Sequence, residues 1–131
     1  MACMFCEIVA RRAPSLIVME NAAAIAFLPL DMEVRGHTLL LPKRHVETLP
    51  QATDEDLLPL FDLSNSIAAR YAERLAMNGF NLLLASGRAA QQSVPHLHFH
   101  FMPRFDGDGL DTWPRLPPFD GDREEFFRSV T

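Results

Sequence analysis

Three histidines spaced two residues apart are the side chains of this sequence with the greatest capacity for chemistry. They lie in the segment 96–101, His-Leu-His-Phe-His-Phe. Side chains alternate between the two faces of a β-strand, so a strand here would present all three imidazoles on one face. Such imidazoles can hold one zinc ion that activates water, or one ring nitrogen can attack phosphorus while its neighbours transfer protons and stabilise charge. The spacing predicts one of these two chemistries.

The loop that precedes these histidines favours the second chemistry. Residues 86–93 are small and polar, and they include Gly87, Gln92 and Ser93. A glycine lets the backbone approach a ligand closely, and short polar side chains next to backbone N–H groups can hold an anion without a positive charge. This composition is more typical of a phosphate site than of a hydrolytic metal centre, so attack by a histidine is the favoured interpretation.

Two cysteines near the start of the sequence form a second candidate site. Cys3 and Cys6 are too close in sequence for a framework disulfide, but their spacing suits two thiolates on one metal ion. The sequence has no apolar run of the roughly 18 to 20 residues that a bilayer span needs, and no basic region precedes its first apolar residues. We therefore expect a cytoplasmic protein whose thiols stay reduced.

Short strands and one long helix must position these residues. Apolar residues at helical spacing predict a helix over 54–77, with Thr53 as its N-cap and Asn78-Gly79 as its stop. The predicted strands are 16–20, 22–28, 37–42, 80–85 and 96–102, the first two forming a hairpin, and a short amphipathic helix is expected at 123–130. Loops too short for crossover helices predict an α+β fold with a mainly antiparallel sheet. The apolar residues between the histidines are expected to pack against the long helix.

Length and charge limit the organisation of the protein and its partners. The 131 residues suit one domain, with the motifs between about 3 and 104 and a C-terminal arm from about 105 to 131 that is rich in Gly, Asp and Pro. Twelve basic residues against seventeen acidic ones give a net charge of −5. No overall positive field therefore attracts a nucleic acid polymer or an anionic membrane, and a bound phosphate must be held by local groups.

The motifs and their order resemble those of the histidine triad (HIT) family of nucleotide-metabolising proteins. The resemblance rests on HLHFHF with the following Met-Pro-Arg, on CMFCEIVARRAP at the start, and on AAIAFL, GHTLLLPKRHVETL and NGFNLLL between them. It implies a single HIT domain over 1–131, with an α+β fold, a homodimer whose protomers share one continuous sheet, and a purine nucleotide site in each protomer. The cysteine pair is similar to that of a zinc-binding bacterial branch among the Hint- and Fhit-like proteins.

The resemblance also assigns roles to residues. His98 matches the nucleophile that takes the nucleotidyl group, and His37 and His100 match the histidines beside the phosphate. Ser93 and Gln92 match positions that hydrogen bond the phosphate and the leaving group. This mechanism needs no catalytic metal, and it requires His98 to be exposed at the mouth of a cleft. The residues that match the apolar slot for a purine base are Met4, Phe5, Ile8, Phe27 and Leu30.

The same resemblance completes the metal site. In the bacterial branch, the histidine of the PKRH segment and the first histidine of the triad join the two cysteines. Here these ligands are Cys3, Cys6, His45 and His96. Two thiolates and two imidazoles form a closed tetrahedral set that is typical of structural zinc. Zinc held in this way would attach the N-terminus to the strand that carries His98 and would contribute to folding.

Three positions depart from the family pattern. Pro29 replaces an acidic residue that binds ribose, with Asp31 two residues further along the chain. Ala85 replaces an asparagine at a strand end, and Gln91 replaces a glycine. Losing two polar contacts of about 1 to 3 kcal/mol each would weaken the binding of a nucleoside monophosphate unless other residues compensate. We expect Arg88 to reach the phosphate or a longer polyphosphate.

The favoured function is a HIT-type hydrolase or nucleotidyl transferase that cleaves at the α-phosphate of a purine nucleoside phosphoramidate or dinucleoside polyphosphate. The reaction would pass through a nucleotidyl-histidine on His98. The departures at Pro29 and Ala85 favour an alternative, which is a nucleotide-binding or protein-interaction module with little or no catalysis. A third hypothesis places a catalytic zinc ion on the three histidines of the strand.

Overall fold

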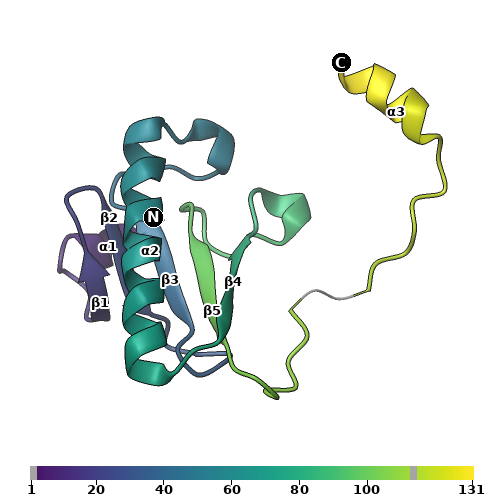
Figure 1. Ribbon diagram of the computed structural model, residues 1–131. Coiled ribbons are helices and arrows are strands. Elements are labelled where there is room, and N and C mark those ends of the chain that lie inside the picture. Colours follow the sequence, from purple (N-terminus) through teal and green to yellow (C-terminus); the bar gives the residue numbers. More distant parts are fainter. Residues whose placement is uncertain (1–2, 113–114) are drawn as a thin grey trace.

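A five-stranded antiparallel sheet forms the centre of the protein, whose computed structural model describes residues 3–112 and 115–131 (Figure 1). The strands lie in the order β1-β2-β3-β5-β4, and each neighbouring pair is antiparallel. Their bounds are Leu16–Glu20 (β1), Ala24–Leu28 (β2), Thr38–Pro42 (β3), Gly79–Leu84 (β4) and Phe99–Arg104 (β5). β1 and β2 form the predicted hairpin, in which the Asn21 side chain accepts hydrogen bonds from the turn. The mainly antiparallel α+β fold is confirmed.

The long helix α2 (Asp54–Leu75) covers one face of the sheet (Figure 1). It begins as predicted, because Thr53 and Asp56 form a capping box. It ends two residues earlier than predicted, since Ala76 takes the left-handed conformation (φ 54°) and Gly79 already belongs to β4. The buried side chains where helix and sheet meet include Leu60, Leu63, Ile67, Leu40, Phe99 and Phe101. The predicted packing of Phe99 and Phe101 against this helix is therefore confirmed.

A short helix, α1 (Met4–Val9), packs on the other side of the sheet from α2. Phe5 and Ile8 of this helix lie in one cluster with Ile25 and Phe27 of β2, whereas the alternate β2 residues face α2. The alternation of strand side chains explains why β2 contributes to both clusters. Sequence patterns did not predict α1, because six residues are too few to show a helical period.

The histidine segment departs from its predicted strand. β5 begins only at Phe99, and its pairing with β4 runs from there, with Phe99 opposite Leu84. The preceding residues leave the sheet ladder, and the backbone N–H of Leu97 donates to the carbonyl oxygen of Val46 at 2.7 Å. The expectation that one strand holds all three histidines is therefore wrong, because His96 and His98 lie before β5.

The chain after β5 leads away from the sheet to α3 (Arg123–Val130), the short C-terminal helix that the sequence predicts (Figure 1). Asp122 caps this helix by accepting hydrogen bonds from two backbone N–H groups. None of the helices in the described parts of the chain is both long and apolar enough to cross a membrane. The division of 1–131 into a motif core and an arm stays a prediction, and residues 113–114 of the arm lie outside the described residues.

Candidate active site and metal site

The ring of His98 is oriented by one short hydrogen bond. Its Nδ1 lies 2.7 Å from the carbonyl oxygen of His96. A carbonyl oxygen can only accept, so Nδ1 carries the proton and Nε2 of the neutral ring keeps its lone pair. Burial lowers the pKa of His98, which favours this neutral form. The second nitrogen of His98 is therefore available as a nucleophile.

His98 is more enclosed than the mechanism was expected to require. Only 4% of the residue is exposed, and the edge of the Phe5 ring lies against it with 5.2 Å between centroids. Among the described residues, every buried side-chain nitrogen or oxygen has a hydrogen-bond partner. Nε2 has no partner among these residues, so this atom itself touches the surface. The expectation of an exposed ring is wrong, but Nε2 of this ring reaches the surface.

His37 and His100 form a hydrogen-bonded pair beside His98. Nε2 of His37 lies 2.9 Å from Nδ1 of His100, and the two rings stack with 5.1 Å between centroids. The ring of His98 is also 5.1 Å from that of His100. Burial lowers the pKa of His37. Burial and the two neighbouring histidines lower the pKa of His100 to about 4, so both rings of the pair are neutral near pH 7.

The loop before the histidines is closed by Gln92. Its side-chain oxygen accepts the N–H of Gly87 at 2.7 Å, and its amide nitrogen donates to the carbonyl oxygens of Glu47 and Val94 at 2.7 and 2.9 Å. Both N–H donors of this amide are therefore engaged. The phosphate contact predicted for Gln92 requires one of these bonds to open. Gln91 has a left-handed backbone (φ 67°), which explains why a glycine suits this position.

The other predicted ligand-binding residues fall into two groups. Phe5, Ile8 and Phe27 pack together in one buried cluster, as an apolar slot requires. Met4 and Leu30 do not join this cluster, being 64% and 98% exposed. Ser93 and Arg88 are exposed on the loop 86–93. The structure therefore brings together three of the five residues predicted for the base slot.

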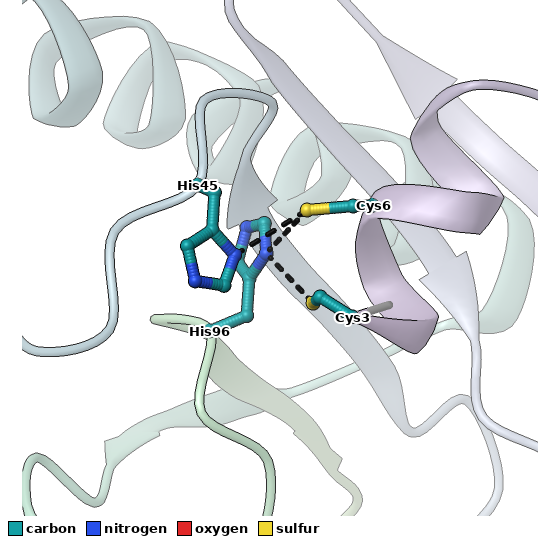
Figure 2. Close-up of side chains that lie close together, drawn as sticks. All are labelled: Cys3, Cys6, His45 and His96. Atoms are coloured by element: carbon teal, nitrogen blue, oxygen red, sulfur yellow. Dashed lines mark hydrogen bonds between the residues drawn. The ribbon is translucent and has the colours of Figure 1, made fainter. Parts of the chain in front are cut away.

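A second cluster joins the N-terminal cysteines to two histidines, as Figure 2 shows. Nδ1 of His96 lies 3.4 Å from Sγ of Cys3 and 3.6 Å from Sγ of Cys6, and Nδ1 of His45 lies 3.3 Å from Sγ of Cys6. All four ligand atoms lie within 4.8 Å of one another. Zinc bonds of about 2.0 to 2.3 Å give a tetrahedron with edges of roughly 3.3 to 3.8 Å. The three sulfur–nitrogen distances therefore match the edges of the predicted tetrahedral set.

His96 belongs to this cluster of two cysteines and two histidines and also contacts the candidate active site. Its Nε2 donates to the carbonyl oxygen of Pro42 at 2.8 Å, which leaves the lone pair of Nδ1 facing the two thiols. Its own carbonyl oxygen orients the ring of His98. The three histidines of the motif thus serve different clusters. A catalytic zinc on all three is not supported, because Nε2 of His96 donates to Pro42 and its Nδ1 faces the two thiols, which leaves no nitrogen of His96 for an ion shared with His98 and His100.

Three contributors to the site have no signal in the sequence. Pro42 and Glu33 act through the backbone, where Pro42 accepts from His96 and the N–H of Glu33 donates to Nδ1 of His37 at 3.2 Å. Val46 accepts the N–H of Leu97 and so fixes the turn between the histidines. Every residue type carries a carbonyl group, so only the fold reveals these roles.

The sequence and the fold are similar to those of known proteins. Residues 10–107 match the family model of the HIT domain. An adenosine 5′-monophosphoramidase of Schizosaccharomyces pombe is 34% identical over 122 residues, which covers 89% of this chain and 86% of the relative. A HIT family member from Bacillus subtilis is similar in structure, with a TM-score of 0.84, 34% identity and coverage of 99% of this chain and 93% of the other.

A solved structure that contains zinc is also similar. It is a Zn-bound histidine triad family protein from Mycobacterium smegmatis, with a TM-score of 0.79, 36% identity and coverage of 98% of this chain and 89% of the other. The family model alone spans well over half of the sequence. On the strength of this match and of the histidine geometry, the chain belongs to the HIT family.

Proposed function

We propose that this chain is a nucleotide hydrolase that cleaves at the α-phosphate of a purine nucleoside phosphoramidate or dinucleoside polyphosphate. One observation carries the proposal: the hydrogen bond from Nδ1 of His98 to the carbonyl of His96 leaves a lone pair on an accessible Nε2. The adenosine 5′-monophosphoramidase among the relatives supports a phosphoramidate as substrate. The family assignment supports nucleotide chemistry in general.

The first step is displacement at phosphorus by His98. Its Nε2 lone pair forms a bond to the α-phosphorus, and the bond from phosphorus to the leaving group breaks on the opposite side. The leaving group takes the electron pair of the broken bond and picks up one proton from solvent water. The imidazole becomes positively charged, and its Nδ1–H bond to the carbonyl of His96 stabilises that charge. His100 and the loop residue Ser93 supply donors for the charge that develops on the phosphoryl oxygens.

The second step returns the enzyme to its starting state. Water attacks the phosphorus of the nucleotidyl-histidine and releases one proton to the solvent, and the bond between Nε2 and phosphorus breaks with its electron pair returning to the ring. The products are the nucleoside monophosphate and the free enzyme. The purine base would lie against Phe5, Ile8 and Phe27, next to the exposed side chains of Met4 and Leu30.

We further propose that Cys3, Cys6, His45 and His96 hold a structural zinc ion. The Zn-bound relative and the lone pair of His96 aimed at both thiols support this assignment. Such a zinc ion supplies folding free energy and needs no open coordination position. The ligands on α1 and before β5 would then attach the N-terminal helix to the histidine segment.

Turnover is the direct test of the proposed activity. The protein is incubated with adenosine 5′-monophosphoramidate, and AMP release is followed by chromatography. His98→Asn should lower kcat at least about 1000-fold, because the nucleophile is removed. Glu73→Gln changes an exposed residue of α2 and is the control for the effect of a substitution as such, so it should keep wild-type turnover. Equal AMP release by His98→Asn and the wild type would contradict the proposal.

The alternative function is a nucleotide-binding module without catalysis. It is favoured by Pro29 and Ala85, which offer no polar side chain where the family binds ribose and phosphate. Tight binding of AMP in a thermal-shift assay, with no release of AMP from phosphoramidate or dinucleoside polyphosphate substrates, would identify the module.

The exposed Arg88 provides a separate test of substrate length. We propose that it contacts the phosphate or a longer polyphosphate. Arg88→Ala should then lower kcat/KM at least about tenfold for a dinucleoside polyphosphate, because a charge-assisted hydrogen bond is lost. Unchanged catalytic efficiency with both substrate classes would exclude this role.

A further inference from the structure

A backbone group in the loop between β2 and β3 determines where the protons of the histidine pair lie. The N–H of Glu33 donates to Nδ1 of His37 at 3.2 Å. His37 is buried. Because its Nδ1 faces an N–H donor, this nitrogen can only accept the bond. The side chain of Glu33 is exposed and takes no part in it.

The positions of two protons follow from this single bond. Because Nδ1 of His37 accepts, the neutral ring carries its proton on Nε2, and this N–H donates to Nδ1 of His100 at 2.9 Å. His100 accepts at Nδ1, so its own proton lies on Nε2. Nε2 of His100 has no partner among the described residues and, like that of His98, touches the surface.

We propose that Glu33 is a positioning residue whose backbone N–H makes His100 present an N–H, rather than a lone pair, to the phosphoryl group. This inference rests on the proposed hydrolase function. Two neighbouring rings, with 5.1 Å between centroids, then differ at Nε2: His98 offers a lone pair to phosphorus, and His100 offers a donor to a phosphoryl oxygen. The contrast is set entirely by the acceptor or donor that each Nδ1 faces.

The charges around the pair keep it neutral. Burial lowers the pKa of both rings, and for His100 the neighbouring His98 and His37 lower it further. The carboxylate of Glu33 acts in the opposite direction on both rings, but its effect is smaller than that of burial. Adding a proton to either ring would also place two N–H donors against each other. The clash would lie between Nε2 of His37 and Nδ1 of His100, or between Nδ1 of His37 and the N–H of Glu33. His100 thus acts as a neutral donor near pH 7.

Nitrogen NMR of the wild-type protein tests the inference without any change in sequence. Long-range ¹H–¹⁵N spectra distinguish the two tautomers of each neutral histidine. We expect Nε2–H on His37, Nε2–H on His100 and Nδ1–H on His98, and the first two should persist well below pH 6.5. A His37 ring with its proton on Nδ1, or one that is charged at pH 7, would overturn the proposal.

Two variants at one position separate the backbone of Glu33 from its side chain. Glu33→Ala keeps the N–H and should keep both tautomers, whereas Glu33→Pro removes the donor and should allow the protons of His37 and His100 to shift toward Nδ1. Loss of the donor on His100 should lower kcat about 100-fold, with a smaller effect on KM. Unchanged tautomers in Glu33→Pro would overturn the proposal. The expected tautomers without any turnover in the wild type would instead overturn the proposed hydrolase.

Discussion

His100 gives the protein a characteristic dependence of stability on pH. Its pKa is about 4 in the folded chain because of burial and of His98 and His37, against about 6.5 in the unfolded chain. Between these values the unfolded chain binds more protons, so the free energy of unfolding rises with pH. The contribution of neutral His100 to the free energy of unfolding is therefore complete above about pH 6.5 and is lost as the pH falls toward 4.

The variant His100→Gln tests this linkage. One group contributes a slope of at most about 1.4 kcal/mol per pH unit. The variant should therefore show a shallower fall in the free energy of unfolding than the wild type, as measured by urea titrations between about pH 4.5 and 7. It keeps all four proposed metal ligands, so acid release of a metal affects both proteins equally. Identical slopes in the two proteins would show that folding does not lower the pKa of His100.

Gln92 is expected to stabilise the loop rather than only to bind substrate. Gln92→Ala removes three hydrogen bonds, two that close the loop on Gly87 and Val94 and one that links it to Glu47 in the segment after β3. The variant should therefore lower the free energy of unfolding by about 1 to 3 kcal/mol in chemical denaturation. The neighbouring Gln91→Ala shortens an exposed side chain and is the matched control. Equal stability of the two variants would mean that the amide does not close the loop.

At the level of elements, α1 is the part of the chain that the proposed zinc ion would hold in place. Cys3 and Cys6 lie one helical turn apart, and Phe5 between them packs against His98. A helix of six residues does not form alone, so α1 depends on the packing of Phe5 and Ile8 and on its cysteine ligands. Loss of the metal would therefore weaken the attachment of α1 and the contact of Phe5 with His98.

The double variant Cys3→Ser/Cys6→Ser tests the metal site. It should lose bound zinc, measured by elemental analysis, and several kcal/mol of stability, while the folded fraction keeps residual turnover. Met4→Ser alters an exposed side chain of the same helix and should bind one zinc ion per chain. Full zinc content in the double variant would show that other residues hold the metal.

The elements of the fold could be predicted from the sequence more fully than the connections within the site. Periodic apolar residues identify α2 and each strand region, because burial of one face dictates the pattern. The sequence could not predict that β5 begins only after His98. That start depends on a backbone hydrogen bond between Leu97 and Val46, which forms only on folding. The hydrogen bond from Gln92 to Glu47 likewise joins residues 45 positions apart in the sequence. The donor at Glu33 is a backbone N–H, which nearly every residue type carries.

At the level of the whole molecule, one edge of the sheet is apolar and unpaired in the single chain. β4 is an edge strand, and the exposed Phe61 of α2 packs on Phe99, the partner of Leu84 in β4. The exposed Leu58 lies three residues before Phe61, on the same side of α2. Exposed apolar patches and free strand edges are typical of interfaces. The homodimer implied by the family resemblance would place a second copy along this edge.

Sedimentation analysis tests this arrangement. The wild type should have twice the mass of one chain, and Leu58→Arg should shift the equilibrium toward the monomer, because it introduces a charge into the patch. Leu16→Arg makes the same change at a residue that is 72% exposed on β1, at the opposite edge of the sheet, and should leave the mass unchanged. A monomeric wild type, or equal effects of the two variants, would exclude pairing along β4.

The proposed mechanism requires Nε2 of His98 to become covalently attached to the nucleotide. A rapid-quench reaction with adenosine 5′-monophosphoramidate at low temperature, stopped under alkaline denaturing conditions and analysed by peptide mass mapping, detects this attachment. We expect one nucleotidyl group, located on the peptide that contains His98, to appear before AMP and then decay. AMP that forms with no adduct at any sampled time, or an adduct on a different residue, would contradict this mechanism.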